Sequence, residues 1–328
     1  MRHTAKALTA AAALVLALTG CAGGPAASET PATPGALRAV NIGAVPTVDI
    51  AVLYLGEKQG FFEDQGLELD IEFGAGGAAL IPALINGQYD IIYSNVISAL
   101  QGVERGLPLV VTAPAGVASG DVEADTAAII VPDDSAIQSP KDLEGKTVAV
   151  NTLSNLHEIM VREVVIKDGG DPDAVQFVEL GLPDMGAALD SGQIDAMSTS
   201  EPWVGTWMQA GDDRIIALNP SEADVDFIHS VYLTTQEKAQ ADPGLIEAWR
   251  AALEESFAYA MDHVDEVKAE MANFSDVDPG ILQQMAMSRY TVDFSRDDVL
   301  RVAEMTQRAH VLQDPEKATD LLIDGAAG

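Results

Sequence analysis

From residue 37 onward, short β-rich segments alternate with longer amphipathic segments, and this alternation constrains the fold more than any other feature of the chain. The strand-like segments are 37–45, 67–73, 90–95 and 107–114, and the helix-like segments between them are 48–62, 76–88 and 96–106. Strands that alternate with helices of this length are typical of parallel β-α-β units. We therefore expect an α/β fold built on parallel strands.

The same alternation starts again near residue 127. The second series comprises a strand at 127–132, a short helix and a strand within 139–150, a helix at 151–170, strands at 174–180 and 195–200, and a helix at 201–211. A β-rich segment at 228–237 then precedes long amphipathic helices. Two similar blocks and a helical tail predict two α/β lobes with the tail packed on the first, and one large sheet is the alternative. We expect lobe 1 to comprise 37–131 and 229–328, and lobe 2 to comprise 132–228.

The first 20 residues have the pattern of a secretory signal peptide. A basic start with Arg2 and Lys6 precedes an apolar run at 7–18, which is too short to span a bilayer comfortably. The run ends in LTGC, which resembles the lipobox of bacterial lipoproteins and makes Cys21, the only cysteine, the lipidated first residue of the mature chain. A spare thiol is the alternative. Residues 21–36 are rich in small residues and proline and predict a flexible tether that holds the protein at the outer face of the cell membrane.

Acidic residues dominate the charge of the chain. Asp and Glu number 51 against 18 Lys and Arg, so the formal net charge is −33. Such an excess keeps a protein soluble and argues against nucleic acid as a partner. A local site for a small anion is still compatible with this charge, because such sites also use backbone N–H groups.

Three turns join an expected strand to an expected helix at the edge where ligands bind in open α/β sheets. They lie at 44–51, 73–80 and 151–158, and Thr47 and Asp49 in the first turn are suited to cap the helix that follows. Helix starts present unpaired N–H groups and partial positive charge to a polar ligand. Simple capping is the alternative at each single turn.

Glu201, Pro202 and Trp203 follow a run of small residues and form another candidate site. Proline suits the first turn of a helix, and Trp203 and Trp207 are four residues apart on one helical face. Glu201 is either a helix-start acid favoured by the dipole or a ligand-binding carboxylate beside a flat aromatic wall. No second acid lies nearby at catalytic spacing, so binding is favoured over catalysis.

Signatures of catalysis, cofactors and metals are weak. The chain has neither a G-x-S-x-G nor an S-x-x-K motif, and its five histidines lack metal-ligand spacing. The glycines at 74–77 fit a loose dinucleotide pattern, but the acid expected about 20 residues later is missing. We therefore expect no cofactor, no metal and no catalytic residue.

Four sequence blocks together resemble the solute-binding proteins of ABC importers, in the nitrate/sulfonate/taurine and thiamine-pyrimidine-precursor group. The blocks lie at 41–73, 83–95, 139–150 and 192–203, and the resemblance covers roughly 38–237. It implies a periplasmic-binding-protein-like fold, with two α/β lobes and a hinge closing on a ligand. It also implies delivery of a small solute to an ABC permease and its ATPase by a monomer that catalyses nothing.

The matching blocks imply which residues face the cleft. These are Pro46, Thr47, Asp49, Gly76, Gly77, Ser94, Asn95, Asn151, Thr152, Ser154, Asn155, Glu201 and Trp203, and His157 lies beside the third turn. None of these turns contains Lys or Arg, whereas Asp49 and Glu201 are present, which favours a neutral or amine-bearing heterocycle such as a pyrimidine-like precursor. A receptor for aliphatic sulfonate, taurine or nitrate is the runner-up. An exported enzyme using Glu201 or His157, and a sensory domain with the same cleft, belong to other classes.

Overall fold

The computed structural model describes residues 37–74 and 76–322. The expected signal peptide at 1–20, the lipidated Cys21 and the tether at 21–36 lie outside the described residues. Among the helices that are described, none combines the length and the apolar character needed to cross a bilayer.

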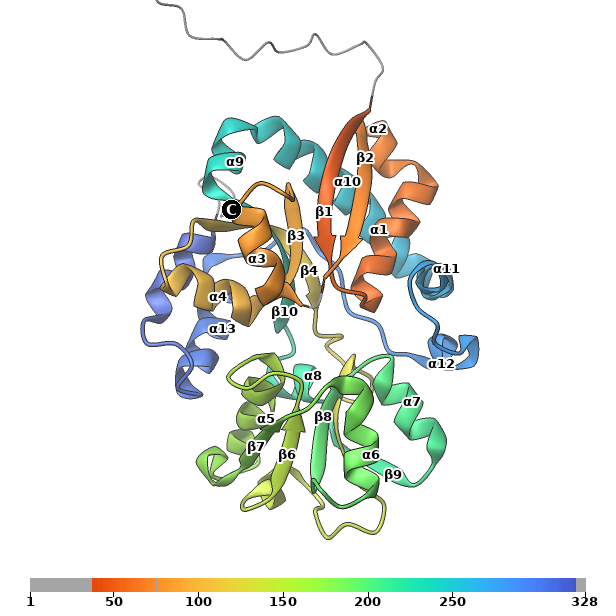
Figure 1. The fold of residues 1–328 in the computed structure, drawn as a ribbon, viewed down its shortest axis with the longest axis vertical. Helices are drawn as coiled ribbons and strands as arrows, with labels where there is room; N and C mark the ends of the chain where they lie inside the picture. The colour runs from red at the N-terminus through yellow and green to blue at the C-terminus, as the bar shows by residue number, and fades with distance from the viewer. Residues whose placement is uncertain (1–36, 75, 323–328) are drawn as a thin grey trace, which may run out of the picture. The chain divides into compact units, whose positions relative to one another are not determined.

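The first sheet has five strands in the order β2-β1-β3-β10-β4 and forms the upper part of Figure 1. Its strands are β1 (Arg38–Ala44), β2 (Leu67–Phe73), β3 (Ile91–Asn95), β4 (Leu109–Val117) and β10 (Ile228–Thr235). β1 pairs parallel with β2 and β3, whereas β10 is antiparallel to both β3 and β4. The strand β10, which lies between β3 and β4, therefore comes from a segment more than a hundred residues beyond its neighbours in the chain.

The second sheet repeats this plan in the order β7-β6-β8-β5-β9. Its strands are β5 (Ala127–Pro132), β6 (Thr147–Val150), β7 (Gln176–Glu179), β8 (Ala196–Ser200) and β9 (Asp213–Ala217). β6 pairs parallel with β7 and β8, and β5 is antiparallel to β8 and β9. Two separate sheets replace the single large sheet that was the alternative, and the predicted α/β fold with two lobes is confirmed.

The structure differs from the sequence analysis in two respects. Each sheet is mixed, because the strand that crosses from the other lobe enters antiparallel. The expected lobe boundary between residues 131 and 132 is wrong, because it cuts through β5, all of which pairs within the second sheet. The first crossing instead occupies 118–126, between β4 and β5, and the second lies at 224–227, between α8 (Asn219–Ala223) and β10.

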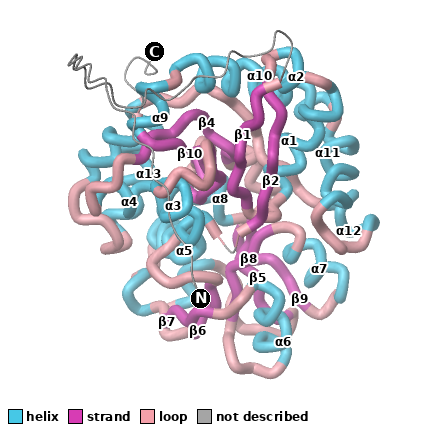
Figure 2. The backbone as a smooth tube through the Cα atoms, turned by 45° about the horizontal axis from the view of Figure 1, so that its top comes forward, coloured by secondary structure: helices cyan, strands magenta, loops and turns pink. Residues whose placement is uncertain are grey.

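Helices cover both faces of the first sheet, as Figure 2 shows. On one face lie α1 (Val48–Gln59), α2 (Phe61–Asp64), α10 (Pro243–Asp262) and α11 (Val264–Glu270), and on the other lie α3 (Gly77–Ile85), α4 (Val96–Glu104) and α13 (Arg296–Arg308). Trp249 of α10 is fully buried and donates from its ring N–H to the Thr112 hydroxyl at 3.1 Å. The tail thus completes the core of the first lobe, as predicted.

Among the long amphipathic helices expected after 228–237, α10 ends at His263, where φ −130° and ψ 47° leave the helical region. The His263 ring stacks on Tyr259, and its Nδ1 lies 2.8 Å from the Tyr259 carbonyl oxygen. A carbonyl oxygen only accepts, so His263 carries a proton on Nδ1 and satisfies a carbonyl group at the end of α10.

The second lobe is covered by α5 (Leu156–Lys167), α6 (Met185–Asp190) and α7 (Trp203–Ala210). α6 and α7 enclose an apolar core that includes Met185, Met197 and Val204. The remaining elements are α9 (Gln236–Ala241), α12 (Pro279–Gln284) and 3-10 turns at Pro140–Leu143, Pro172–Ala174, Leu182–Asp184, Met271–Asn273 and Pro315–Leu321. Ile281 of α12 packs against Gly205 of α7, so one part of the tail also contacts the second lobe.

Arg289 joins the two crossing segments to the C-terminal tail. Its Nε donates to the Ala118 carbonyl at 2.8 Å, and its Nη2 donates to the Val225 carbonyl at 2.7 Å and to Asp226 at 2.9 Å. Asp125 ties the first crossing segment to α8, because its buried carboxylate accepts the N–H of Ser221 at 2.8 Å. The chain between the lobes is therefore held by specific polar contacts.

Candidate functional site

A cavity of about 620 Å³ lies between the two sheets. Its walls come from segments that follow the carboxyl ends of strands in both lobes, and the lining residues are Val45–Asp49, Gly74, Gly76, Gly77, Tyr93, Asn95, Thr126, Ala127, Asn151, Thr152, Asn155–His157, Met160, Gly181–Pro183, Ser200–Trp203, Pro220, His229 and Ser288. Ligands of open α/β sheets collect at this edge. A cavity of several hundred cubic ångströms accommodates a small organic molecule.

Most of the predicted cleft residues line this cavity. Those that do are Pro46, Thr47, Asp49, Gly76, Gly77, Asn95, Asn151, Thr152, Asn155, His157, Glu201 and Trp203. Ser94 and Ser154 do not. Ser94 is fully buried and bonds to the Asn95 carbonyl, whereas Ser154 is exposed, with its N–H bonded to Glu158 and its carbonyl to Gln101.

Gly77 has a steric role where α3 begins. A Cβ atom at this position would lie 2.2 Å from the Ser94 Oγ, which is far inside contact distance. Gly77 therefore lets the start of α3 approach β3 closely, and the buried Ser94 fills the space beneath it. This fit explains why a glycine stands in the second predicted turn.

Asp49 is buried at the floor of the cavity, with 3% of its surface exposed. Its Oδ2 accepts the hydroxyls of Tyr93 at 2.9 Å and Ser230 at 3.2 Å, and its Oδ1 accepts those of Ser288 at 2.8 Å and Tyr290 at 3.4 Å. Burial, together with the nearby Asp49 carboxylate, raises the pKa of Tyr93 and of Tyr290 well above the usual value. Four donors match the acceptor capacity of one carboxylate, so Asp49 fixes the hydroxyl groups around it.

Glu201 is held by backbone groups from both lobes. Its Oε2 accepts the Gly205 N–H at 3.0 Å, in the first turn of α7, and its Oε1 accepts the Ala286 N–H of the tail at 3.4 Å. Burial raises the pKa of Glu201. One oxygen of Glu201 therefore caps the start of α7, as the first of the two interpretations expected. The residue also lines the cavity.

His157 is buried in the second lobe between two serines. Its Nδ1 lies 2.9 Å from the Ser198 Oγ, and its Nε2 lies 2.9 Å from the Ser200 Oγ. Burial, with a smaller contribution from His229, lowers the pKa of His157 from 6.5 to about 4. The imidazole is therefore neutral at neutral pH.

Trp203 begins α7 and presents part of its ring to the cavity. It stacks against Trp207, with ring centroids 6.4 Å apart and an angle of 24° between the planes. Trp207 in turn packs so closely on α6 that a Cβ on Gly186 would lie 2.4 Å from its ring. The packing of Trp207 against α6 thus supports the ring of Trp203.

Several cavity residues were not predicted from the sequence. Tyr93 and Ser200 belong to predicted strands. Ser200 ends its strand directly before Glu201, which was a usable signal, whereas Tyr93 lies in the middle of β3. His229 and Ser288 come from the crossing strand and the irregular tail, where no local pattern marks a site. The His229 Nε2 lies 3.1 Å from the Ser288 Oγ, whose proton is donated to Asp49, so His229 acts as the donor in this pair.

The charges of the cavity wall have one sign. Neither Lys nor Arg is among the described lining residues, whereas Asp49 and Glu201 both contribute carboxylates. Within residues 37–74 and 76–322, no group of three or more His, Cys, Asp or Glu side chains is arranged to hold a metal ion. The arrangement offers hydroxyl, amide, imidazole and aromatic groups to a ligand.

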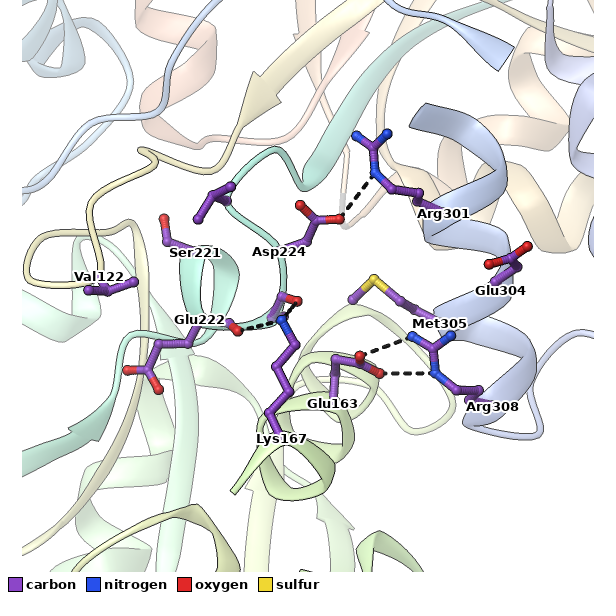
Figure 3. A pocket seen from close by; sticks show the side chains of 12 residues that line it. Val122, Glu163, Lys167, Ser221, Glu222, Asp224, Arg301, Glu304, Met305 and Arg308 are labelled. Carbon is purple, nitrogen blue, oxygen red and sulfur yellow. Dashed lines mark hydrogen bonds and ion pairs between the residues drawn. The ribbon is translucent and has the colours of Figure 1, made fainter. Parts of the chain in front are cut away.

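A second hollow of about 680 Å³ lies between α5, α8 and α13 (Figure 3). Its cationic groups are bonded to partners within the hollow. Arg308 pairs with Glu163 at 3.0 Å, Arg301 pairs with Asp224 at 3.2 Å, and Lys167 donates to the Glu222 carbonyl at 3.1 Å. Because α5 belongs to the second lobe and α13 packs on the first, this charged seam joins the lobes.

Two α/β lobes with a crossing strand in each sheet and a cavity between them define a periplasmic-binding-protein-like fold. The profile of the NMT1/THI5-like family matches residues 47–267, and the chain belongs to that family. The family resemblance inferred from the sequence is confirmed.

Known proteins with related sequences and structures include binding proteins for different solutes. The formylaminopyrimidine-binding protein of Halalkalibacterium halodurans is 25% identical over 224 residues, which cover 65% of this chain and 63% of that protein, less than two thirds of its length. The alkanesulfonate-binding protein of Xanthomonas axonopodis pv. citri bound to MOPS has a TM-score of 0.70 and 18% identity, covering 87% of this chain and 98% of its own. The periplasmic nitrate-binding protein of Synechocystis PCC 6803 has a TM-score of 0.68 and 13% identity, covering 87% and 85%.

Proposed function

We propose that the chain is the solute-binding protein of an ABC importer, anchored by a lipid on Cys21 at the outer face of the cell membrane. It captures a small nitrogen heterocycle of the pyrimidine type between its lobes and passes it to a membrane permease and the ATPase of that permease. The bilobal fold, the family membership and the lipobox-like LTGC sequence support this role. It acts as a monomer and catalyses no reaction.

The observation that carries the ligand class is the charge of the cavity wall. The described lining contains two carboxylates and no cation, so the wall repels an anion and favours a neutral or amine-bearing molecule. Asp49 and Glu201 exert this effect although protein donors already occupy their oxygens. Trp203 provides a flat surface for a ring, and the name of the Halalkalibacterium halodurans relative points to the same class of molecule.

A receptor for an aliphatic sulfonate, taurine or nitrate is the second candidate. The names of the structural neighbours favour it, and so do the starts of α1, α3 and α5, all of which reach the cavity. An enzyme acting on a pyrimidine precursor is less well supported. His157 is enclosed by two serines and remains neutral, and Glu201 bonds to backbone groups.

A thermal-shift panel on residues 37–328, which form one compact unit, tests the ligand class. The panel contains a formylaminopyrimidine, other pyrimidines, taurine, an alkanesulfonate and nitrate. A ligand at a hundred times its dissociation constant stabilises the folded state by about 2.7 kcal/mol. We expect the pyrimidines to raise the melting temperature. A rise with sulfonates or nitrate alone would refute the proposed class, and turnover of a pyrimidine would refute the binding role.

A further inference from the structure

We propose that Ser200 donates a hydrogen bond to an acceptor atom of the solute, and that His157 and Ser198 hold its hydroxyl in the donor orientation. This inference rests on the proposed function, because it assigns one polar contact within the same cavity. It concerns a residue outside the turns from which the site was predicted.

The geometry begins with β8, where Ser198 and Ser200 are two residues apart and therefore project from the same face of the strand. His157, in the first turn of α5, inserts its ring between them, with each ring nitrogen 2.9 Å from one hydroxyl oxygen. Both nitrogens are bonded, so turning the ring over would bring carbon atoms against the two oxygens. The ring is locked in one orientation by this pair.

A neutral imidazole has one donor nitrogen and one acceptor nitrogen, so the two serines must play opposite roles. The burial that lowers the pKa of His157 to about 4 keeps it in this neutral form. Either Nδ1 accepts from Ser198 and Nε2 donates to Ser200, or both bonds run in the reverse direction. The second partner of Ser198 decides between these arrangements.

Ser198 is fully buried, and its second partner is Asn219, which is also fully buried. The Asn219 Nδ2 donates to the Ser198 Oγ at 3.0 Å, and the Asn219 Oδ1 has no protein partner among the described residues. Turning the amide over would leave a buried NH₂ group unpaired instead of a carbonyl oxygen, and unpaired buried N–H groups are the rarer of the two. Ser198 therefore accepts from Asn219 and has its own proton available for His157.

The proton of Ser198 goes to the Nδ1 atom of His157, because no other acceptor in the described part of the chain is bonded to that hydroxyl. His157 then carries its proton on Nε2 and donates it to the Ser200 oxygen. The proton of Ser200 is left without a protein acceptor among the described residues, and Ser200 lines the cavity. The chain of bonds from Asn219 to Ser200 thus ends in a donor that faces the solute.

The proton assignment is tested without any ligand by recording the imidazole ¹⁵N spectrum of residues 37–328 near pH 7.5. We expect the neutral Nε2–H tautomer for His157. His263 is an internal reference, because its Nδ1 lies 2.8 Å from a carbonyl oxygen and must carry a proton. A spectrum that shows the neutral Nδ1–H tautomer, or a cationic ring, for His157 would overturn the assignment.

The contact itself is tested by calorimetric titration of Ser200→Ala with a formylaminopyrimidine. Loss of one hydrogen bond is expected to weaken binding roughly fivefold to tenfold. Ser191→Ala is the matched control, since Ser191 lies in the same lobe, bonds to the Ala188 carbonyl and does not line the cavity. Unchanged affinity in Ser200→Ala would overturn the inference. Failure of the wild-type protein to bind the probe would refute the proposed ligand, while the ¹⁵N spectrum still decides the proton assignment.

Discussion

Ser288 donates its hydroxyl to the Asp49 carboxylate at 2.8 Å, and this bond joins residues 239 positions apart in the chain. It brings the irregular C-terminal tail against the first turn of α1, directly at the cavity. Tyr93, Ser230 and Tyr290 complete the set of hydroxyl groups around the same carboxylate. One wall of the cavity is therefore built by an acid that organises four hydroxyl donors from three distant segments, namely β3, β10 and the tail.

Replacing Asp49 by Asn should destabilise the protein, because Asn keeps one acceptor oxygen and places an NH₂ donor where two of the four buried hydroxyl groups now donate to the other carboxylate oxygen. We expect the free energy of unfolding to fall by about 1–3 kcal/mol in urea titrations. Asp64→Asn is the control, since Asp64 is an exposed acid of the same lobe. Equal unfolding free energies for Asp49→Asn and the wild type would contradict the role given to Asp49.

The Glu201→Gln substitution separates ligand binding from capping. Gln keeps a side-chain oxygen for the Gly205 N–H and loses only the long 3.4 Å bond from the Ala286 N–H, so the unfolding free energy should change by less than about 1 kcal/mol. Removing the negative charge should weaken the binding of an amine-bearing pyrimidine by about 1.5–3 kcal/mol, measured by calorimetry. A lower melting temperature with unchanged affinity would show that Glu201 serves only as a cap.

Trp203 should report solute binding through its fluorescence. Because its ring lines the cavity, ligand-induced quenching should disappear in Trp203→Ala. Trp249→Phe is the control, since Trp249 is buried between the sheet and α10 and should leave the quenching intact. Quenching that persists in Trp203→Ala would place the responsive ring elsewhere.

His157 should make stability depend on pH. Its folded-state pKa of about 4 lies below the ordinary value of 6.5, so between these values the unfolded chain binds more protons than the folded chain. The unfolding free energy should therefore fall as the pH drops through this window, by at most about 1.4 kcal/mol per pH unit from this group. Urea unfolding at pH 7 and pH 5 should show a smaller loss for His157→Gln than for the wild type. Equal losses would mean that His157 does not remain neutral in the folded state.

The ion pair between Arg308 and Glu163 should contribute to cohesion between the lobes. The Glu163 side chain is 9% exposed, so removing its partner leaves a nearly buried charge unpaired. We expect Arg308→Ala to lower the unfolding free energy by about 1 kcal/mol. Arg296→Ala is the matched control, because its pair with Glu316 is exposed on both sides and should change stability little. Equal losses of unfolding free energy in Arg308→Ala and Arg296→Ala would contradict the stabilising role given to the Arg308–Glu163 pair.

The parts of the fold that depend on local patterns were predictable. Alternating segments predicted the strands and helices, and the turns after β1, β2 and β6 do reach the cavity, because the carboxyl ends of parallel strands share one edge of a sheet. Pairing between distant segments left no such signal. The sequence therefore did not reveal that β5 belongs wholly to the second sheet or that β10 enters the first sheet antiparallel.

The same distinction holds for the site. Ser94 was expected in the cleft from its place in a matching block, but packing beneath Gly77 buries it. Ser154 was expected there from the turn at 151–158, but it is exposed, with a positive φ of 52°. Ser288 reaches the cavity through the fold of the tail, which has no periodic pattern near that residue. Non-local packing therefore decides which polar residues face the solute.

We propose that the two carboxylates in the described cavity lining, with no cation beside them, select a neutral or amine-bearing heterocycle over an anion. Isothermal titration calorimetry of residues 37–328 with a formylaminopyrimidine and with an alkanesulfonate that carries no amine, in the same buffer, tests this selection. We expect saturable binding of one pyrimidine per chain and a dissociation constant at least roughly tenfold lower than that for the alkanesulfonate, a difference of about 1.4 kcal/mol. Tighter binding of the alkanesulfonate would contradict this proposal and support the sulfonate receptor.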